Sequence, residues 1–175
     1  MRYILYFIFI LGFLSCRQEG NHLPERKTGQ SEETDNSLIE INKFLVKKDA
    51  RLILAYIDRM NWDMKIDSAG YWYEILSEGN GPKAQPGKTI TLEYTLHLLD
   101  GTKVYSSSEN GPKAFKIGQG GIESGLELGV LQLQEGDSAR FIFPPHLAHG
   151  LIGDGERIPA RSSIVYHLKV TDLSP

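Results

Sequence analysis

Apolar and polar residues alternate along three segments of the chain, and this period of two predicts strands with one buried face. The clearest segment is 89–99, in which every second residue from Ile90 to Leu98 is apolar. Residues 71–75 and 164–170 repeat the pattern, and a further strand is expected at 138–143, after a turn at 134–137. Asp100-Gly101 is typical of a hairpin turn, so we expect the strand 89–99 to pair with residues 102–106.

A longer period, close to that of a helix, precedes these strands. Ser37 and Glu40 form a capping box, and the apolar residues of 38–45 fall on one helical face. A second helical stretch is expected to start at Asp49, with an apolar face that extends to Met60. A short amphipathic helix is not stable alone, so the segment 37–66 must dock on its own domain or on a partner chain. Of these two, we favour its own domain.

One more short helix is predicted for residues 121–131, because Ile122, Leu126 and Val130 lie four residues apart. Gly125 and Gly129 lie inside it, and each costs roughly 1 kcal/mol relative to alanine. Glycines are tolerated there where another group must approach the backbone closely. One short helix against four to six antiparallel strands makes the expected fold class α+β.

The amino-terminal residues have the pattern of an export signal and are not expected to belong to the folded domain. Residues 1–15 hold an uncharged apolar run after Arg2, which is typical of a signal peptide. Cys16 follows at a position that resembles a bacterial lipobox, so we expect a lipid anchor on its thiol; the alternative is an ordinary secretion signal with an incidental cysteine. The polar residues 16–36 predict a flexible tether. We therefore expect a lipoprotein of the bacterial cell envelope that faces the periplasm.

Composition and charge exclude several functions. The net charge of −3, without a basic stripe, argues against nucleic-acid binding. A metal site would have to use His97, His146, His149 and His167, but no cysteine or carboxylate spacing accompanies them, so no metal is expected. The region between Tyr94 and Tyr166 has aromatic and aliphatic residues separated by glycines, a pattern that suits an apolar cleft better than covalent chemistry.

The order and spacing of several motifs resemble the FKBP family of peptidyl-prolyl cis-trans isomerases. These motifs are Glu93-Tyr94-Thr95, Asp100-Gly101, Phe115-x-x-Gly118, Gly125-x-x-x-Gly129, Gly136-Asp137, Ala148-x-Gly150 and Ile158-Pro159-Ala160. The resemblance covers residues 71–173 and implies an FKBP-like twisted antiparallel sheet wrapped on one short helix. It also implies catalysis of X-Pro bond rotation in a dry apolar cleft without a cofactor. The barrier to that rotation is about 18–20 kcal/mol, and the twisted amide has a less polar carbonyl, so a dry cleft binds it better than the planar form.

The resemblance assigns roles to particular residues. The residues it implies for catalysis are Tyr94, Phe115, Ile122 and Tyr166, and those it implies for substrate binding are Val104, Tyr105, Leu126, His149 and Ile158. Phe115 and Tyr166 would form walls, and Ile122 would offer its backbone N–H to the peptide. From the pattern alone, core packing is the favoured explanation of the same apolar positions. Glu123, Glu127 and Asp154 are expected to be solvated, with Glu123 the one that could meet a peptide.

The chain also departs from the family pattern at the cleft. Val104 and Tyr105 replace a phenylalanine and an aspartate, and Leu126 replaces a tryptophan. The other replacements are Lys113 for phenylalanine, Glu123 for isoleucine and His149 for tyrosine. These changes predict a differently shaped cleft and weaker catalysis.

Two further functions therefore remain open. One is a catalytically weak or inactive module, or chaperone, that binds proline-containing segments of exported proteins. The other is a structural lipoprotein of a gliding-motility or secretion machine, and so part of an envelope protein complex. The second rests on Trp62-Asp63-Met64 and Gly70-Tyr71-Trp72-Tyr73, which resemble the gliding-motility-associated isomerase-like lipoproteins of Bacteroidetes.

Overall fold

The computed structural model describes residues 28–175, and side chains from Asn36 onward. Residues 40–175 form one compact unit, which contains the whole sheet. Residues 28–39, the first part of helix α1 (Thr28–Met60), belong to a separate unit. The signal peptide, Cys16 and most of the expected tether lie outside the described residues. None of the described helices has the length and apolarity needed to cross a membrane.

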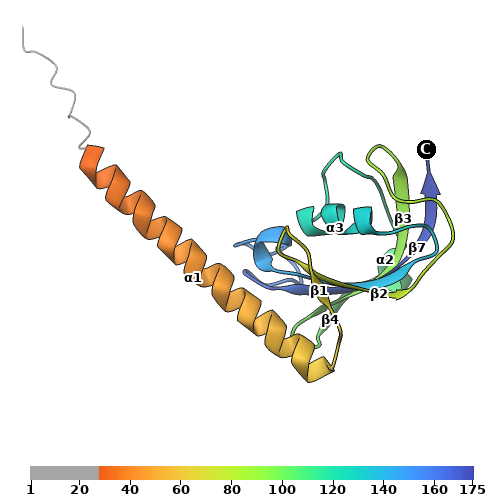
Figure 1. The fold of residues 1–175 in the computed structure, drawn as a ribbon, viewed down its shortest axis with the longest axis horizontal. Coiled ribbons are helices and arrows are strands. Elements are labelled where there is room, and N and C mark those ends of the chain that lie inside the picture. The colour runs from red at the N-terminus through yellow and green to blue at the C-terminus, as the bar shows by residue number, and fades with distance from the viewer. Residues whose placement is uncertain (1–27) are drawn as a thin grey trace, which may run out of the picture. The chain divides into compact units, whose positions relative to one another are not determined.

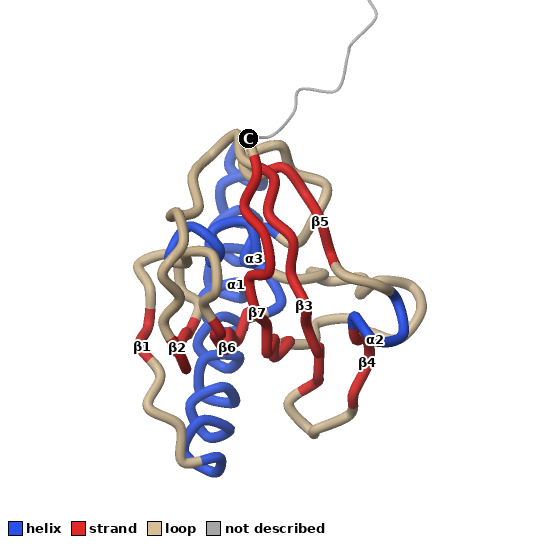
Figure 2. Tube along the Cα trace, turned by 90° about the vertical axis from the view of Figure 1, so that its right-hand side faces the viewer, coloured by secondary structure: helices blue, strands red, loops and turns tan. Residues whose placement is uncertain are grey.

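The fold is a seven-stranded antiparallel sheet with a short helix on one face (Figure 1). Its strands are β1 (Lys65–Ile66), β2 (Trp72–Ser77), β3 (Thr89–Leu98), β4 (Lys103–Ser106), β5 (Lys113–Lys116), β6 (Ser138–Phe143) and β7 (Ile164–Ser174). The order is β1-β2-β6-β7-β3-β4, and β5 pairs with β3, beside which it lies in Figure 2. The remaining helices are α2 (Ser107–Asn110) and α3 (Ser124–Gly129), with 3-10 turns at Val130–Gln132 and Pro145–Leu147.

The two faces of the sheet carry two separate hydrophobic clusters. Alternation along β6 divides them: Phe141 and Phe143 pack in the cluster that includes Leu126 of α3, whereas Ile142 packs in the cluster that includes Ile53 of α1. Strand β7 repeats this division, with Tyr166 in the first cluster. Helix α3 and helix α1 thus pack on opposite faces of the same strands.

The sequence-based prediction of an α+β fold is confirmed, with differences in detail. The strands expected at 89–99 and 138–143, the hairpin at Asp100-Gly101 and the final strand are all present. The sheet has seven strands rather than four to six, because the short β1 and β5 add to its edges. Helix α2 was not anticipated; it is a single turn after β4 and buries none of its residues.

Helix α1 differs from its prediction at both ends. It is one continuous helix in place of two, and it starts at Thr28, inside the expected tether. Extending an existing helix costs less than nucleating a new one, so the first turns can form from polar sequence. It ends at Met60 rather than at 66, because Asn61 adopts a left-handed φ of 52°. The Asn61 N–H donates to Asp58 O at 3.0 Å and the Trp62 N–H to Ile57 O at 3.1 Å, which makes a Schellman termination.

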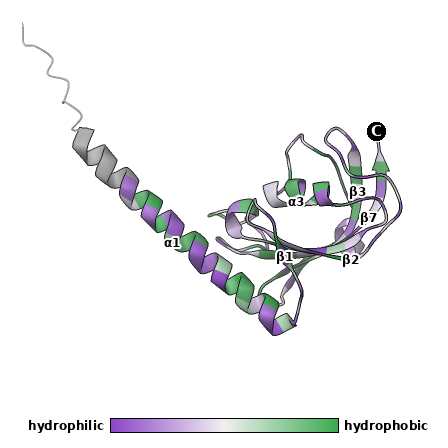
Figure 3. Cartoon of the chain, in the orientation of Figure 1, coloured by the Kyte–Doolittle hydropathy of each residue, from purple (hydrophilic) through white to green (hydrophobic). Residues whose placement is uncertain are grey.

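The second half of α1 docks on the protein's own sheet. Ile53, Tyr56 and Ile57 are buried against a cluster that contains Ile142 and Val165. This confirms that the helical segment packs on its own domain. The apolar face expected for the first stretch is exposed, with Leu38 and Phe44 each 59% accessible and Ile41 52%. Figure 3 colours α1 by hydropathy and shows apolar positions along the helix.

The two glycines of α3 lie where the aromatic side chains of β6 approach the helix backbone. A Cβ on Gly125 would lie 2.5 Å from Cδ1 of Phe143 and 2.8 Å from the carbonyl oxygen of Leu147. A Cβ on Gly129 would lie 2.9 Å from Cε1 of Phe141. The close approach expected from the sequence is therefore confirmed, and it explains why helix-breaking residues occupy a short helix.

A single added methyl group tests this packing. Gly125→Ala should lower the free energy of unfolding by about 1–3 kcal/mol, because overpacking outweighs alanine's better helix propensity. Ser124→Ala, on the exposed side of the same helix, should change stability by less than about 0.5 kcal/mol. Urea unfolding monitored by tryptophan fluorescence measures both. A Gly125→Ala variant as stable as the Ser124→Ala control would contradict the close-packed interface.

Candidate functional site

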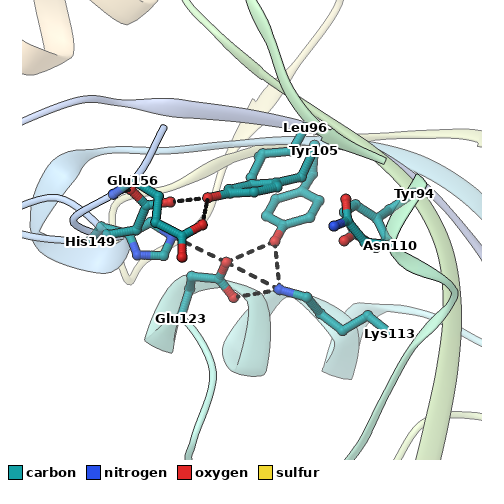
Figure 4. A pocket seen from close by; sticks show the side chains of 10 residues that line it. Tyr94, Leu96, Tyr105, Asn110, Lys113, Glu123, His149 and Glu156 are labelled. Atoms are coloured by element: carbon teal, nitrogen blue, oxygen red, sulfur yellow. Dashed lines mark hydrogen bonds and ion pairs between the residues drawn. The ribbon is translucent and has the colours of Figure 1, made fainter. Parts of the chain in front are cut away.

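A pocket of about 360 Å³ opens where the curved sheet faces α3 and the 144–163 loop (Figure 4). Its lining residues come from seven segments: Tyr94, Leu96, Tyr105, Asn110, Lys113, Glu123, His149, Asp154, Glu156 and Tyr166. A neighbouring pocket of about 430 Å³ shares Lys113, Glu123 and His149, and adds Ile122 and Ala148. The shared residues make the two pockets halves of one cleft.

Two tyrosines form the aromatic wall of the cleft. Tyr94 on β3 and Tyr166 on β7 are diagonal neighbours across the β3–β7 ladder, since Leu96 pairs with Tyr166 and Tyr94 with Leu168. Their ring centroids are 5.8 Å apart, and Phe143 contacts the Tyr166 ring edge-on at 6.1 Å. Tyr166 is fully buried and Tyr94 is 9% exposed, so the wall is held rigidly by the core.

A partly buried ion pair lies against this wall. The Lys113 ammonium on β5 is 3.1 Å and 3.2 Å from the two carboxylate oxygens of Glu123. It also donates to the Tyr166 hydroxyl oxygen at 3.0 Å, and it lies 5.6 Å and 5.5 Å from the ring centroids of Tyr94 and Tyr166. The Tyr166 hydroxyl donates to Oε1 of Glu123 at 2.8 Å, and Nε2 of His149 is 3.3 Å from the same oxygen. Three polar groups, from Lys113, Tyr166 and His149, thus meet at one carboxylate.

The surroundings of Glu123 keep its carboxylate charged although only 6% of its side chain is exposed. Burial alone would raise the pKa of Glu123, but contact with His149, the charge of Lys113 and the Tyr166 hydroxyl outweigh it and lower the pKa to about 2. Burial and the negative charge of Glu123 raise the pKa of Tyr166, so its hydroxyl stays protonated. The prediction that Glu123 is solvated is therefore wrong, because Lys113, Tyr166 and His149 replace water around it.

Tyr105 and Asp154 organise the opposite rim. The Tyr105 hydroxyl donates to Oδ2 of Asp154 at 2.5 Å and lies 3.3 Å from a carboxylate oxygen of Glu156. The bond to Asp154 raises the pKa of Tyr105 to about 12. The other oxygen of Asp154 accepts the backbone N–H groups of Glu156, Arg157 and Ile158 at 2.8–3.0 Å. Asp154 therefore fixes the turn of the loop and joins it to β4.

The structure brings together only some of the residues implied by the sequence. Tyr94, Tyr105, His149 and Tyr166 line the main pocket, and Ile122 lines its neighbour. The other four lie behind the lining: Val104, Leu126 and Ile158 are buried in the core, and Phe115 is half-buried against it. For these four, core packing is the role that the structure describes.

Sequence reasoning missed several lining residues, chiefly Lys113 as a partner of Glu123. The signal was available, because both positions depart from the family pattern and their replacements carry opposite charges. Their separation of ten positions in the sequence hid the pairing. Within the described part of the chain, no three His, Cys, Asp or Glu side chains group as metal ligands would.

The acid stability of the protein tests the charge state of Glu123. The ordinary pKa of a glutamate is 4.5, and that of Glu123 is about 2, so the folded state binds this proton more weakly than the unfolded state. The stability that Glu123 contributes is therefore complete above about pH 4.5 and is lost as the pH falls towards 2. Glu123→Gln should be about 1–3 kcal/mol less stable than the unaltered protein at pH 7, because Lys113 loses its partner.

Denaturant unfolding at several pH values measures this difference. The gap between Glu123→Gln and the unaltered protein should close as the pH falls from 4.5 to 2. Glu93→Gln, at an exposed position of β3 that faces away from the cleft, is the matched control and should show no such closing gap. A gap for Glu123→Gln that stays constant with pH would show that the carboxylate is not held in its charged form.

Comparison with known proteins identifies the domain. A family model described as FKBP-type peptidyl-prolyl cis-trans isomerase matches residues 81–171. FK506-binding protein 2 of Yarrowia lipolytica is 36% identical over 105 residues, which cover 59% of this chain and 73% of that protein. The probable FKBP-type isomerase FkpA of Neisseria meningitidis is 32% identical over 111 residues, which cover 63% of this chain and 40% of that protein. The inactive isomerase FKBP6 of Mus musculus is 29% identical over 106 residues, which cover 59% of this chain and 32% of that protein.

The fold agrees with a solved structure. The crystal structure of FkpA from Escherichia coli has a TM-score of 0.63 with this chain at 22% identity, and covers 88% of this chain and 75% of that one. The chain spans only part of other relatives, such as 28% of FK506-binding protein 59 of Drosophila melanogaster. Since the family model matches just over half of the residues, the chain belongs to the FKBP-type peptidyl-prolyl cis-trans isomerase family.

Proposed function

We propose that this protein catalyses rotation about X-Pro bonds in exported proteins, and that the cleft between Tyr94, Tyr166 and the 144–163 loop binds the proline segment. The observation that carries the proposal is the rigid tyrosine wall in a pocket of about 360 Å³, within a domain of the FKBP-type isomerase family. Proline packs well on aromatic rings, and the pocket is open enough to admit an extended peptide.

Catalysis of X-Pro rotation requires differential binding of the twisted amide rather than a reactive group. Rotation breaks amide resonance, so the twisted amide must be bound more tightly than either planar isomer. The tyrosine wall holds the proline ring, and the enclosed side of the cleft separates the amide from water. The Lys113–Glu123 pair makes part of this surface polar, so the expected apolar cleft is realised only along its aromatic wall. Because the twisted carbonyl prefers an apolar surrounding, we expect slower turnover than in a wholly apolar cleft.

The same ion pair favours a second candidate, a module that binds proline-containing segments without turnover. One of the relatives carries the word inactive in its name, so membership of the family does not by itself establish catalysis. Both candidates use the same pocket. They differ in whether the bound peptide rotates faster than the free one.

An assay of prolyl isomerisation without a coupled protease separates the two. The folded protein should accelerate isomerisation of an X-Pro peptide. Tyr94→Leu should lower kcat/KM by about tenfold, because part of the aromatic wall is lost, a loss of about 1.4 kcal/mol of transition-state binding. Leu128→Ala, at an exposed position of α3, should leave the rate unchanged.

The outcome assigns the function. A rate equal to that of buffer, from folded protein, would exclude the isomerase. In that case, chemical-shift changes at the cleft on titration with a proline peptide would support the binding module.

We further propose that the protein is a lipoprotein of the bacterial envelope, anchored through Cys16, with clients among exported proteins. The apolar run of residues 3–14 followed by Cys16 supports this. A role in a gliding-motility or secretion machine of the Bacteroidetes type is the more specific form of the proposal. If the protein has a structural role in such a machine, a variant without isomerase activity should still allow the machine to work.

Membrane attachment can be tested directly. The full-length protein, expressed in a bacterium, should fractionate with the membranes and incorporate radiolabelled palmitate. Cys16→Ser should abolish the label and release the protein from the membranes, because the substitution removes the thiol that carries the lipid anchor. Ser15→Ala is the neighbouring control, and should keep both properties. A label that persists in Cys16→Ser would exclude this cysteine as the lipid site.

A further inference from the structure

The loop that borders the cleft is joined to helix α1 by an ion pair. The Arg161 guanidinium lies 2.7 Å from Oδ2 of Asp49. Asp49 is only 8% exposed, which is unusual for an aspartate unless it is paired. These two residues are separated by 112 positions in the sequence, so the contact exists only because α1 docks on the sheet.

Arg161 is also held by the loop itself. Its backbone N–H donates to the carbonyl oxygen of Gly150 at 3.0 Å, which closes the segment between the two residues. Its φ of 57° lies in the left-handed region, which costs about 1 kcal/mol or more for a residue with a side chain. A strained backbone persists where its surroundings fix it, and here the side chain is fixed by Asp49.

The closed segment carries two of the pocket residues, and a third flanks it. His149 immediately precedes Gly150, and its carbonyl oxygen accepts the N–H of Gly153 at 3.2 Å. Asp154 and Glu156 follow, and their turn is fixed by the bonds to the oxygen of Asp154. A movement at Arg161 would therefore be passed to His149 beside Glu123 and to Asp154 beside Tyr105.

Packing alone does not fix the loop against α1 at this point. A cavity of about 110 Å³ lies between them, lined by Leu45 and Val46 of the helix and by Pro145 and Leu151 of the loop, together with the ion pair. Unfilled space means that apolar contacts are incomplete there. The ion pair is consequently the specific link between the two segments.

We propose that Asp49 and Arg161 are positioning residues of the cleft, through which helix α1 holds the 144–163 loop in its binding conformation. The proposal rests on the proposed proline-binding function of this cleft. Helix α1 lies outside the family match at 81–171, so part of the cleft's geometry is set by a segment that precedes the family domain. The competing explanation is that the pair only adds to global stability.

Single substitutions in the full chain separate these explanations. Asp49→Asn keeps the shape of the side chain but removes its charge, and should lower kcat/KM for an X-Pro peptide about tenfold, since small misplacements in a site can cost up to about 100-fold. Arg161→Gln should have the same effect, and the double variant should be no worse than either one. Arg161→Lys, which can still pair with Asp49, should retain more activity than Arg161→Gln.

The matched control loosens α1 without touching the loop. Ile53→Val removes one methyl group from the docked face of the helix, so it should lower the thermal midpoint and leave kcat/KM within about twofold. If Ile53→Val reduced kcat/KM as much as Asp49→Asn, the effect would be one of stability, and the positioning role would be excluded.

A second measurement does not depend on turnover. The imidazole signals of His149, assigned by comparison with His149→Gln, should shift in Asp49→Asn and stay in place in Ile53→Val. If the unaltered protein does not catalyse isomerisation, the proposed activity is excluded. The positioning role is then still tested by the His149 signals and by the affinity for a proline peptide. Unchanged His149 signals and unchanged affinity in Asp49→Asn would overturn it.

Discussion

The antiparallel pairing of β3 with β7 is the interaction on which the rest of the structure depends. It extends from Thr89 paired with Ser174 to Leu98 paired with Ile164, and it forms the centre of the sheet. Strand alternation turns this ladder into a two-sided support. One side places the tyrosine wall in the cleft, and the other places Val165 under helix α1. The cleft and the helix are thus attached to the same backbone, which explains how a segment outside the family domain can influence the site.

The polar centre of the cleft is the main physical difficulty for the proposed isomerisation. A prolyl isomerase gains from dryness, whereas Lys113 and Glu123 bring two charges to the tyrosine wall. Burying a charged pair costs desolvation, and it is tolerated only when further hydrogen bonds satisfy it. Tyr166 supplies one of these, and contact with His149 adds to it. The result is a group of close polar contacts that stabilises the pocket's shape while making it less favourable for a twisted amide.

The 144–163 loop is the part of the site that depends most on its neighbours. Its inner turn is stabilised by Asp154, which accepts three backbone N–H groups, and its rim by the bond from Tyr105. Its outer end is fixed by Arg161 and Asp49. A long loop of this kind has little structure of its own, and these few polar contacts replace the regular hydrogen bonding of a strand.

The main strands, the hairpin and the reason for the glycines of α3 could be predicted from the sequence, because strand alternation and turn chemistry are local properties that leave a direct pattern. The short edge strands β1 and β5 left no such pattern. The sequence also identified Tyr94 and Tyr166 as cleft residues through their motifs. Which residues share the pocket follows from tertiary contacts instead: Lys113 and Glu123 form a partly buried pair, whereas Leu126 and Ile158 lie in the core. The tertiary structure likewise decided that α1 is continuous and reaches the cleft loop. These outcomes depend on contacts between residues far apart in the chain, and such contacts follow from packing and desolvation rather than from any local period.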